Sequence, residues 1–242
     1  MKYIQRCITK IMPFEEMNWK EIEAMDKDTI LFLTIGPMEE HGPHLPVGTD
    51  FFIAKYRMAR DFVGTISIEW KLIRGILHQI FLSMSKMGFK YIIICNFHMD
   101  LHHIKAIHSA ISKAKGMVIC EPISSYYFKG TLWHADDKKE VHADMKETSL
   151  ALFAFPHLAK QWDALPPVKI KMDGPDALFK TMKEMGAKEG YVGSPSLASE
   201  KYGEEMFKKL VDIVIQTAEK MVAGDKLPDL PPKIKILLKL IK

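Results

Sequence analysis

Residues 91–100 read YIIICNFHMD, and this stretch decides the fold. The run 91–95 is apolar without alternation, which is typical of a strand buried on both faces of a parallel sheet. Polar side chains follow at once, among them His98 and Asp100, which are of the kinds that bind metals. Because parallel sheets place their binding sites at the carboxyl ends of the strands, the residues after each strand are the first candidates for function.

The same alternation of short apolar runs and longer amphipathic stretches extends in both directions along the chain. It predicts an α/β fold with a mostly parallel β-sheet flanked by helices on both faces. No repeat or linker interrupts the pattern, so we expect a single domain over residues 1–242. The expected strands are 30–35, 91–95 and 117–120, and the expected helices are 72–87, 104–114, 147–158 and 204–222.

The composition argues against several classes of protein. With 48% hydrophobic and 26% charged residues the chain is ordinary globular material, and a net charge of +4 is too small to indicate a nucleic-acid-binding protein. Cys7, Cys95 and Cys120 are too far apart for a disulfide framework or a cysteine zinc site. We recognise no signal peptide, membrane span or glycine-rich nucleotide loop, so we expect a cytoplasmic protein without a nucleotide cofactor.

The richest cluster of polar residues follows the first strand, where residues 36–50 read GPMEEHGPHLPVGTD. Imidazole nitrogen and carboxylate oxygen are usual ligands of divalent metals. Glu39 and His41 are two residues apart on an extended segment, so they can bind different metals. The two carboxylate oxygens of Asp50 can bridge those metals. The competing interpretation is a polar surface loop whose histidines only form hydrogen bonds. The position directly after a buried strand favours the metal site.

The second cluster follows the strand 91–95. His98 and Asp100 are two residues apart, so on an extended strand exit both side chains point the same way. His98 and His102 are four apart, as in a helical zinc pair, but Met99 stands where a metalloprotease motif has Glu. We therefore prefer the strand-exit interpretation, and we expect His102, His103 and His108 to be ordinary helix-face residues.

The third cluster is His142-Ala143-Asp144-Met145-Lys146-Glu147-Thr148-Ser149, directly before an apolar helix. Taken alone, it is best explained as a helix N-cap with acidic residues in the first turn. Among the aromatic residues, Trp133 lies nine positions before His142 and is a candidate for the wall of a pocket.

Together the three clusters resemble the creatininase family, the creatinine amidohydrolases. The most specific match is the segment 39–50, with Glu-x-His-Gly-Pro-His-Leu-Pro-x-Gly-Thr-Asp. The segments 64–67 (GTIS), 88–98, 142–149 and 190–203 resemble further family motifs in the same order. The resemblance runs from about residue 30 to about residue 220 and implies a parallel α/β fold.

The resemblance also implies a site for two divalent metal ions, commonly zinc, manganese or iron. Glu39 and His98 would bind one metal, His41 the other, and Asp50 would bridge them. Creatininases use Glu two residues after the His98 position as the last ligand, and Asp100 stands there in this chain. His142 matches the histidine that serves in proton transfer. The residues expected to orient the ligands by hydrogen bonds are His44, Asn96 and Glu147.

The expected function is then a metal-dependent amidohydrolase. A water bridged between the two metals would attack a non-peptide C–N bond in a small cyclic amide or formamide. The resemblance further implies a homo-oligomer, up to a hexamer. The alternative is a non-catalytic metal-binding or assembly subunit. It rests on a family segment that is missing between Asp50 and Gly64. Phe97, Met99 and Leu101 are bulkier than the family's residues and would narrow the pocket, which argues against creatinine itself as the substrate.

Residues 226–242 form a basic amphipathic tail, in which Ile234, Leu237, Leu238 and Ile241 share one helical face. A helix of this kind can lie on a membrane surface. We favour docking of the tail on its own domain or on a neighbouring subunit, so no membrane partner is expected.

Overall fold

The computed structural model describes residues 12–37, 39–50, 68–133, 140–170 and 180–241. Its sheet consists of β1 (Ile30–Ile35), β2 (Tyr91–Asn96) and β3 (Val118–Cys120), which lie side by side in that order. Both strand pairs are parallel, with Ile30 opposite Tyr91 and Ile93 opposite Cys120. The GTIS segment and the stretch where family residues are missing lie outside the described residues.

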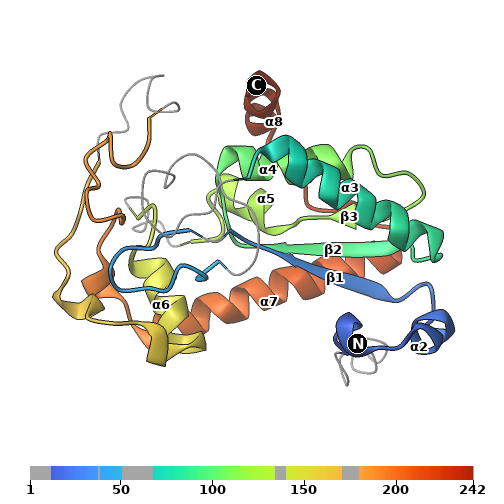
Figure 1. Cartoon of the computed structure of the whole chain (residues 1–242), viewed down its shortest axis with the longest axis horizontal. Coiled ribbons are helices and arrows are strands. Elements are labelled where there is room, and N and C mark those ends of the chain that lie inside the picture. Colours follow the sequence, from blue (N-terminus) through green and yellow to red (C-terminus); the bar gives the residue numbers. More distant parts are fainter. Residues whose placement is uncertain (1–11, 38, 51–67, 134–139, 171–179, 242) are drawn as a thin grey trace.

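Two helices, α3 (Trp70–Lys86) and α4 (Leu101–Ile111), connect successive strands and cover one face of the sheet, whereas α7 (Glu200–Ala223) runs along the other face (Figure 1). Side chains of a strand alternate between its two faces. Ile92 and Ile94 therefore pack with the helices α3 and α4, and Ile93 packs near Met221 of α7. All three isoleucines are buried, which confirms the interpretation of the apolar run as a strand covered on both sides.

The expected fold class, an α/β domain with a parallel sheet between helices, is confirmed, and the strand 30–35 has the expected bounds. The helices α4 and α7 begin earlier than expected because polar N-caps extend them. Asp100 accepts hydrogen bonds from the backbone of α4, and Ser199 accepts one from the backbone of α7. The helix expected over 147–158 is instead α6 (Met145–Ala154), which ends before Pro156.

Shorter elements complete the described part of the chain. The tail folds as a helix, α8, that packs on α4 through Leu238, so the expected docking on its own domain is observed. No helix among the described residues is long and apolar enough to cross a membrane. The remaining elements are η1 (Phe14–Glu16), α2 (Trp19–Ala24), α5 (Ile123–Phe128), η4 (Pro156–Leu158), η5 (Trp162–Ala164), η7 (Pro195–Leu197) and α8 (Pro232–Leu240).

Candidate metal centre

The two sequence clusters that follow β1 and β2 meet at one edge of the sheet. Ile35, the last residue of β1, lies opposite Asn96, the last residue of β2. The segments that follow the two strands therefore leave the sheet at the same edge. The segment after β1 carries Glu39, His41 and Asp50, and the segment after β2 carries His98. The parallel register alone therefore brings ligand-type residues from distant parts of the sequence together.

Asp50 lies between two histidines. Its Oδ2 atom is 3.1 Å from Nδ1 of His98 and 3.4 Å from Nε2 of His41. The carboxylate is buried, and the ring of His41 has no exposed surface. One carboxylate that reaches both imidazoles is the arrangement that a bridging ligand requires.

Glu39 completes the side of the site nearest His98. Its Oε1 atom is 3.3 Å from Nδ1 of His98 and 3.7 Å from Nδ1 of His142. The ring of His142 also lies 4.6 Å from the ring of His41, centroid to centroid. His142 thus faces the ligand cluster from the turn before α6.

Glu147, on the first turn of α6, closes the opposite side. Its Oε2 atom is 3.7 Å from Nε2 of His41 and accepts a hydrogen bond from the backbone N–H of Ala143. Ala143 has a left-handed backbone with φ of 44°, which is unusual for a residue other than glycine. Asp144 caps α6 through the N–H groups of Lys146 and Glu147. The third cluster therefore provides both the N-cap of α6, Asp144, and two side chains that face the other ligand-type residues, His142 and Glu147.

Three groups of these side chains are close enough to hold a metal ion, with ligand atoms within 4.8 Å of one another. The structure brings Glu39, His41, Asp50, His98 and His142 together, and it places Glu147, expected only to orient ligands, among them. The groups are Glu39 with Asp50 and His98, His41 with Asp50 and Glu147, and Glu39 with His41 and His142.

Asp100 is not in any of these groups. Its Oδ1 atom accepts hydrogen bonds from the backbone N–H groups of His102 and His103 at 2.8 and 3.2 Å, so it serves as the N-cap of α4. The spacing from His98 suits a ligand as well as a cap, but the helix that begins at Leu101 turns this carboxylate to the backbone. In this geometry the carboxylate beside His41 belongs to Glu147. The resemblance to the family had implied Asp100 as the last ligand.

The burial of several carboxylates together perturbs the protonation of the cluster. Burial raises the pKa of Glu39 and of Glu147. Burial alone would lower the pKa of His98, but Glu39 and Asp50 outweigh it and raise that pKa to about 10. The pKa of His41 is raised well above its usual value in the same way, chiefly by Asp50. The carboxylates thus attract positive charge to this point, which a divalent cation bound there would supply.

The hydrogen bonds of His41 direct one ring nitrogen at the cluster. Nδ1–H of His41 donates to the backbone oxygen of Glu39 at 3.0 Å, so the ring would present the lone pair of Nε2 once a metal displaces the proton there. Nε2 of His41 and Oδ1 of Asp50 are buried and have no hydrogen-bond partner among the described residues. A buried polar atom without a partner is costly, and a metal ion would satisfy both. The residues present therefore fit a divalent metal centre.

His142 is held by a different segment. Its Nε2–H donates to the backbone oxygen of Glu40 at 2.8 Å, and its backbone pairs with Val192 in an antiparallel bridge. Burial, together with the charge of His41, lowers the pKa of His142 to about 4. The neutral ring therefore presents Nδ1 as a proton acceptor to the cluster. The role of Val192 in holding His142 could not be foreseen from the sequence motif.

Asn96 orients His98, as expected. Its Oδ1 accepts a hydrogen bond from the backbone N–H of His98 at 3.1 Å, and its Nδ2 donates to the backbone oxygen of His98 at 2.9 Å. His103, expected only on a helix face, is fully buried, and its Nε2–H donates to Asn96 at 2.9 Å. His44 is buried behind the site and forms a hydrogen bond of 3.0 Å with Thr148 of α6.

The bulky residues around His98 do not all face the site. Met99 and Leu101 pack in the apolar cluster beneath α8, so the expectation that they narrow the pocket is not met. Phe97 lies edge-to-face against Trp133 at 6.0 Å, and Trp133 contacts Tyr127 in the same manner at 6.4 Å. The candidate pocket residue Trp133 is thus part of an aromatic wall next to the His98 loop.

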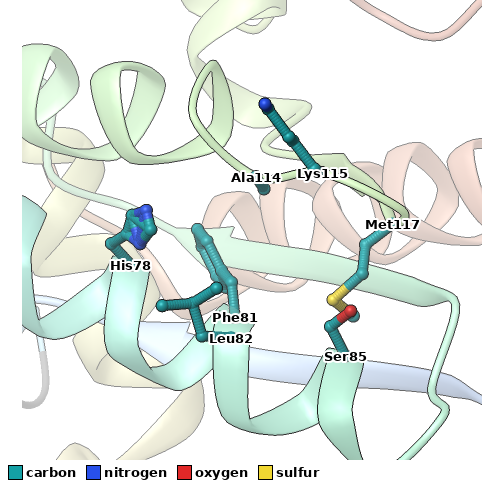
Figure 2. A pocket seen from close by; sticks show the side chains of 7 residues that line it. All are labelled: His78, Phe81, Leu82, Ser85, Ala114, Lys115 and Met117. Atoms are coloured by element: carbon teal, nitrogen blue, oxygen red, sulfur yellow. The ribbon is translucent and has the colours of Figure 1, made fainter.

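A small cavity between α3 and the chain before β3 lies away from this centre (Figure 2). It is lined in part by Phe81, Ser85 and Met117 and has a volume of about 10 Å³, room for one water molecule at most. The helix α3 runs antiparallel to the strands, so this cavity lies toward their amino ends, away from the metal ligands. It is too small to hold a substrate.

Comparison with known proteins agrees with this geometry. A family model described as Creatininase, creatinine amidohydrolase, matches residues 15–61 and 55–218. The chain belongs to the creatininase family. No curated protein matches the chain significantly.

Solved structures of creatininases share the fold. The structure named "creatinine amidohydrolase (creatininase)" has a TM-score of 0.68 at 18% identity and covers 86% of this chain and 97% of its own. The structure named "Creatininase Mn" has a TM-score of 0.66 at 19% identity, covering 86% and 98%. A mutant creatininase of "Zn-Zn type" has a TM-score of 0.64 at 18% identity, covering 86% and 97%. Family, fold and the clustered ligands support a metal-dependent amidohydrolase of amide C–N bonds that uses divalent metals.

Proposed function

We propose that this protein hydrolyses a non-peptide C–N bond, in a small cyclic amide or formamide, at a centre for two divalent metals. The observation that carries the proposal is the position of Asp50, whose Oδ2 atom is within 3.4 Å of both His41 and His98. Glu39 and His98 would hold one metal, and His41 and Glu147 the other, with Asp50 shared between them. Zinc and manganese are the first candidates, since both occur in the names of structures with this fold.

When bound, two such metals lower the pKa of a water bridged between them and polarise the carbonyl of the substrate. The chain's own residues then supply position and proton transfer. Nδ1 of His142 faces the cluster while its Nε2–H is tied to Glu40, so the neutral ring can accept a proton from the attacking water at Nδ1 and pass it to the leaving nitrogen. The aromatic wall of Phe97, Tyr127 and Trp133 would limit the substrate to a small, flat molecule.

The metal content of purified protein tests the site. After dialysis against Mn²⁺ or Zn²⁺, elemental mass spectrometry is expected to give about two metals per chain. Glu147→Gln is expected to lower the ratio to about one, because it removes a carboxylate beside His41 alone. Asp50→Asn is expected to lower it further, because it removes the shared ligand.

Asp100→Asn is the matched control, since Asp100 is half-buried like Glu147 and close to His98 in sequence. Asn caps helices as well as Asp does, so this variant is expected to keep about two metals. If the metal-to-chain ratio falls in Asp100→Asn but not in Glu147→Gln, the second metal is bound by Asp100, as the sequence resemblance implies, and not by Glu147. A ratio near zero in the wild-type chain would reject the metal centre and favour a non-catalytic assembly subunit.

With two metals bound, a screen of small cyclic amides and formamides tests the reaction. Turnover of one of them that is lost in His142→Ala, while the metal content stays near two, is the expected result. A fully metal-loaded chain without turnover of any amide would contradict the proposed reaction but not the metal site. We expect a homo-oligomer in solution, which light scattering measures directly.

A further inference from the structure

The outer face of α8 combines exposed apolar and basic side chains. One side of this helix is buried through Leu238, which packs with Ile104 and Leu230. On the opposite side Ile236 is 60% exposed and Leu240 is 72% exposed. They are four residues apart and therefore adjacent on the helix surface. Lys233 and Lys239, both exposed, flank this apolar pair.

The layer beneath α8 is strongly basic. Residues 70–120 and 232–242, which include α3, α4 and α8, carry eleven Lys or Arg and a single acidic residue, Asp100, which caps α4. Two of the eleven are paired with acidic residues outside these ranges, Lys90 with Asp28 and Lys235 with Asp229. The rest of the chain has 23 Lys or Arg against 29 Asp or Glu and is net acidic. The modest charge of the whole protein thus conceals an uneven distribution of charge along the chain.

Three cations gather where α3, α4 and the end of α8 meet. Nζ of Lys105 lies 4.3 Å from the ring centroid of Trp70, and the charged groups of Lys71 and Arg74 lie 5.8 and 5.2 Å from it. Lys105 also donates a hydrogen bond to the backbone oxygen of Ile241. Burial, with repulsion from Lys71 and Arg74, lowers the pKa of Lys105. No ion pair between described residues neutralises any of these three side chains.

We propose that the α8 surface, formed by Lys233, Ile236, Lys239 and Leu240 with Lys71 and Lys105 beside it, docks on a bilayer of anionic lipids. Figure 1 shows α8 at the edge of the molecule, beyond α4. Ile236 and Leu240 would enter the region of the headgroups, while the lysines would remain at the level of the lipid phosphates.

The combination of charge and apolar surface selects this partner. A nucleic acid would neutralise the lysines but would leave Ile236 and Leu240 in contact with phosphate and water. A second copy of the α8 surface would bring like charges together, because Lys233 and Lys239 have no ion-pair partner among the described residues and the nearby Asp229 already pairs with Lys235. An anionic bilayer matches both properties at once, since each lysine near such a surface strengthens binding about fivefold.

Sedimentation of the full chain with vesicles tests the proposal. We expect binding to vesicles of phosphatidylcholine with phosphatidylglycerol, weakened by high salt, and no binding to phosphatidylcholine alone. Lys233→Gln with Lys239→Gln is expected to weaken binding about 25-fold. Ile236→Ser with Leu240→Ser is expected to weaken it at least about tenfold. All four residues are exposed, so the thermal unfolding of these variants should match that of the wild type.

Matched controls lie elsewhere on the surface. Lys201→Gln with Lys209→Gln removes the same charge from α7, and Leu197→Ser changes a leucine that is 72% exposed, as Leu240 is. Both are expected to bind as the wild type does. The absence of binding to anionic vesicles at low salt, or an equal loss in the controls, would overturn the proposal. A change of molecular mass in light scattering for Ile236→Ser with Leu240→Ser, without vesicle binding, would assign the surface to protein association instead.

Discussion

At the scale of single residues, His44 links the metal centre to α6 and is held in its neutral form. Its ring is buried, and burial, with the charges of His41 and His142, lowers its pKa to about 4. Between about pH 6.5 and 4 the unfolded chain therefore binds a proton at this position that the folded chain does not bind. Folding stability must fall as the pH drops through this range.

We expect His44→Gln to reduce this loss of stability, because glutamine can keep a hydrogen bond to Thr148 without a titrating group. The melting temperature of metal-free protein, measured at steps from about pH 7.5 to about pH 4.5, should fall less steeply in the variant than in the wild type. His157, which is exposed, provides the control, and His157→Gln should follow the wild-type curve. Identical slopes for His44→Gln and the wild type would refute this account.

The sequence predicted several residues of the candidate metal centre because their signal is local. Glu39, His41 and Asp50 follow a strand that its apolar run identifies, and His98 follows the next strand. Asp100 shows the limit of spacing, since the same position suits a ligand and a helix cap, and only the start of α4 decides between them. His103 was missed because its contact with Asn96 depends on how α4 turns back over the end of β2.

At the scale of elements, the crossing of α6 and α7 depends on one glycine. A Cβ atom at Gly203 would overlap the backbone oxygen of Ser149. Because backbone atoms cannot yield as side chains do, Gly203→Ala must separate the two helices. The first turn of α6 carries Glu147, so this separation would also disturb the metal centre.

We expect Gly203→Ala to lower the free energy of unfolding by about 3 kcal/mol and to lower the metal content of the protein. Gly75→Ala, in the exposed middle of α3, is the matched control because nothing lies within 4 Å of its added Cβ. That change should stabilise the protein by about 0.5–1 kcal/mol. Chemical denaturation measures both, and a Gly203→Ala protein as stable as the wild type would contradict the close approach of the helices.

Strands and helices differed in how well the sequence located them. The strands β1 and β2 were predicted almost residue by residue, because an apolar run between polar residues has clear ends. The starts of α4 and α7 were placed about one turn late. Their N-caps, Asp100 and Ser199, extend each helix beyond its first apolar turn, which hydrophobic spacing alone does not register.

At the scale of the whole molecule, the tail helix supports the segment that follows His98. Met99, next to His98, and Leu101, the first residue of α4, pack in the same apolar cluster as Leu238 and Leu230. Periodicity predicted that α8 would present an apolar face, but it could not identify the surface that this face covers. The structure shows that α8 packs against the residues that follow His98.

We therefore expect Leu238→Ala to destabilise the protein by about 3 kcal/mol, because it leaves a cavity between α8 and α4. It should also weaken metal binding about tenfold, because the His98 loop loses its apolar support. Leu240→Ala, two residues further on the exposed side of the same helix, should change stability by less than about 0.5 kcal/mol and leave metal binding unchanged. Calorimetric titration of metal-free protein with Mn²⁺ measures the affinities. Equal affinities in Leu238→Ala and the wild type would mean that the loop holds His98 without help from α8, and that Asn96 and His103 alone fix its position.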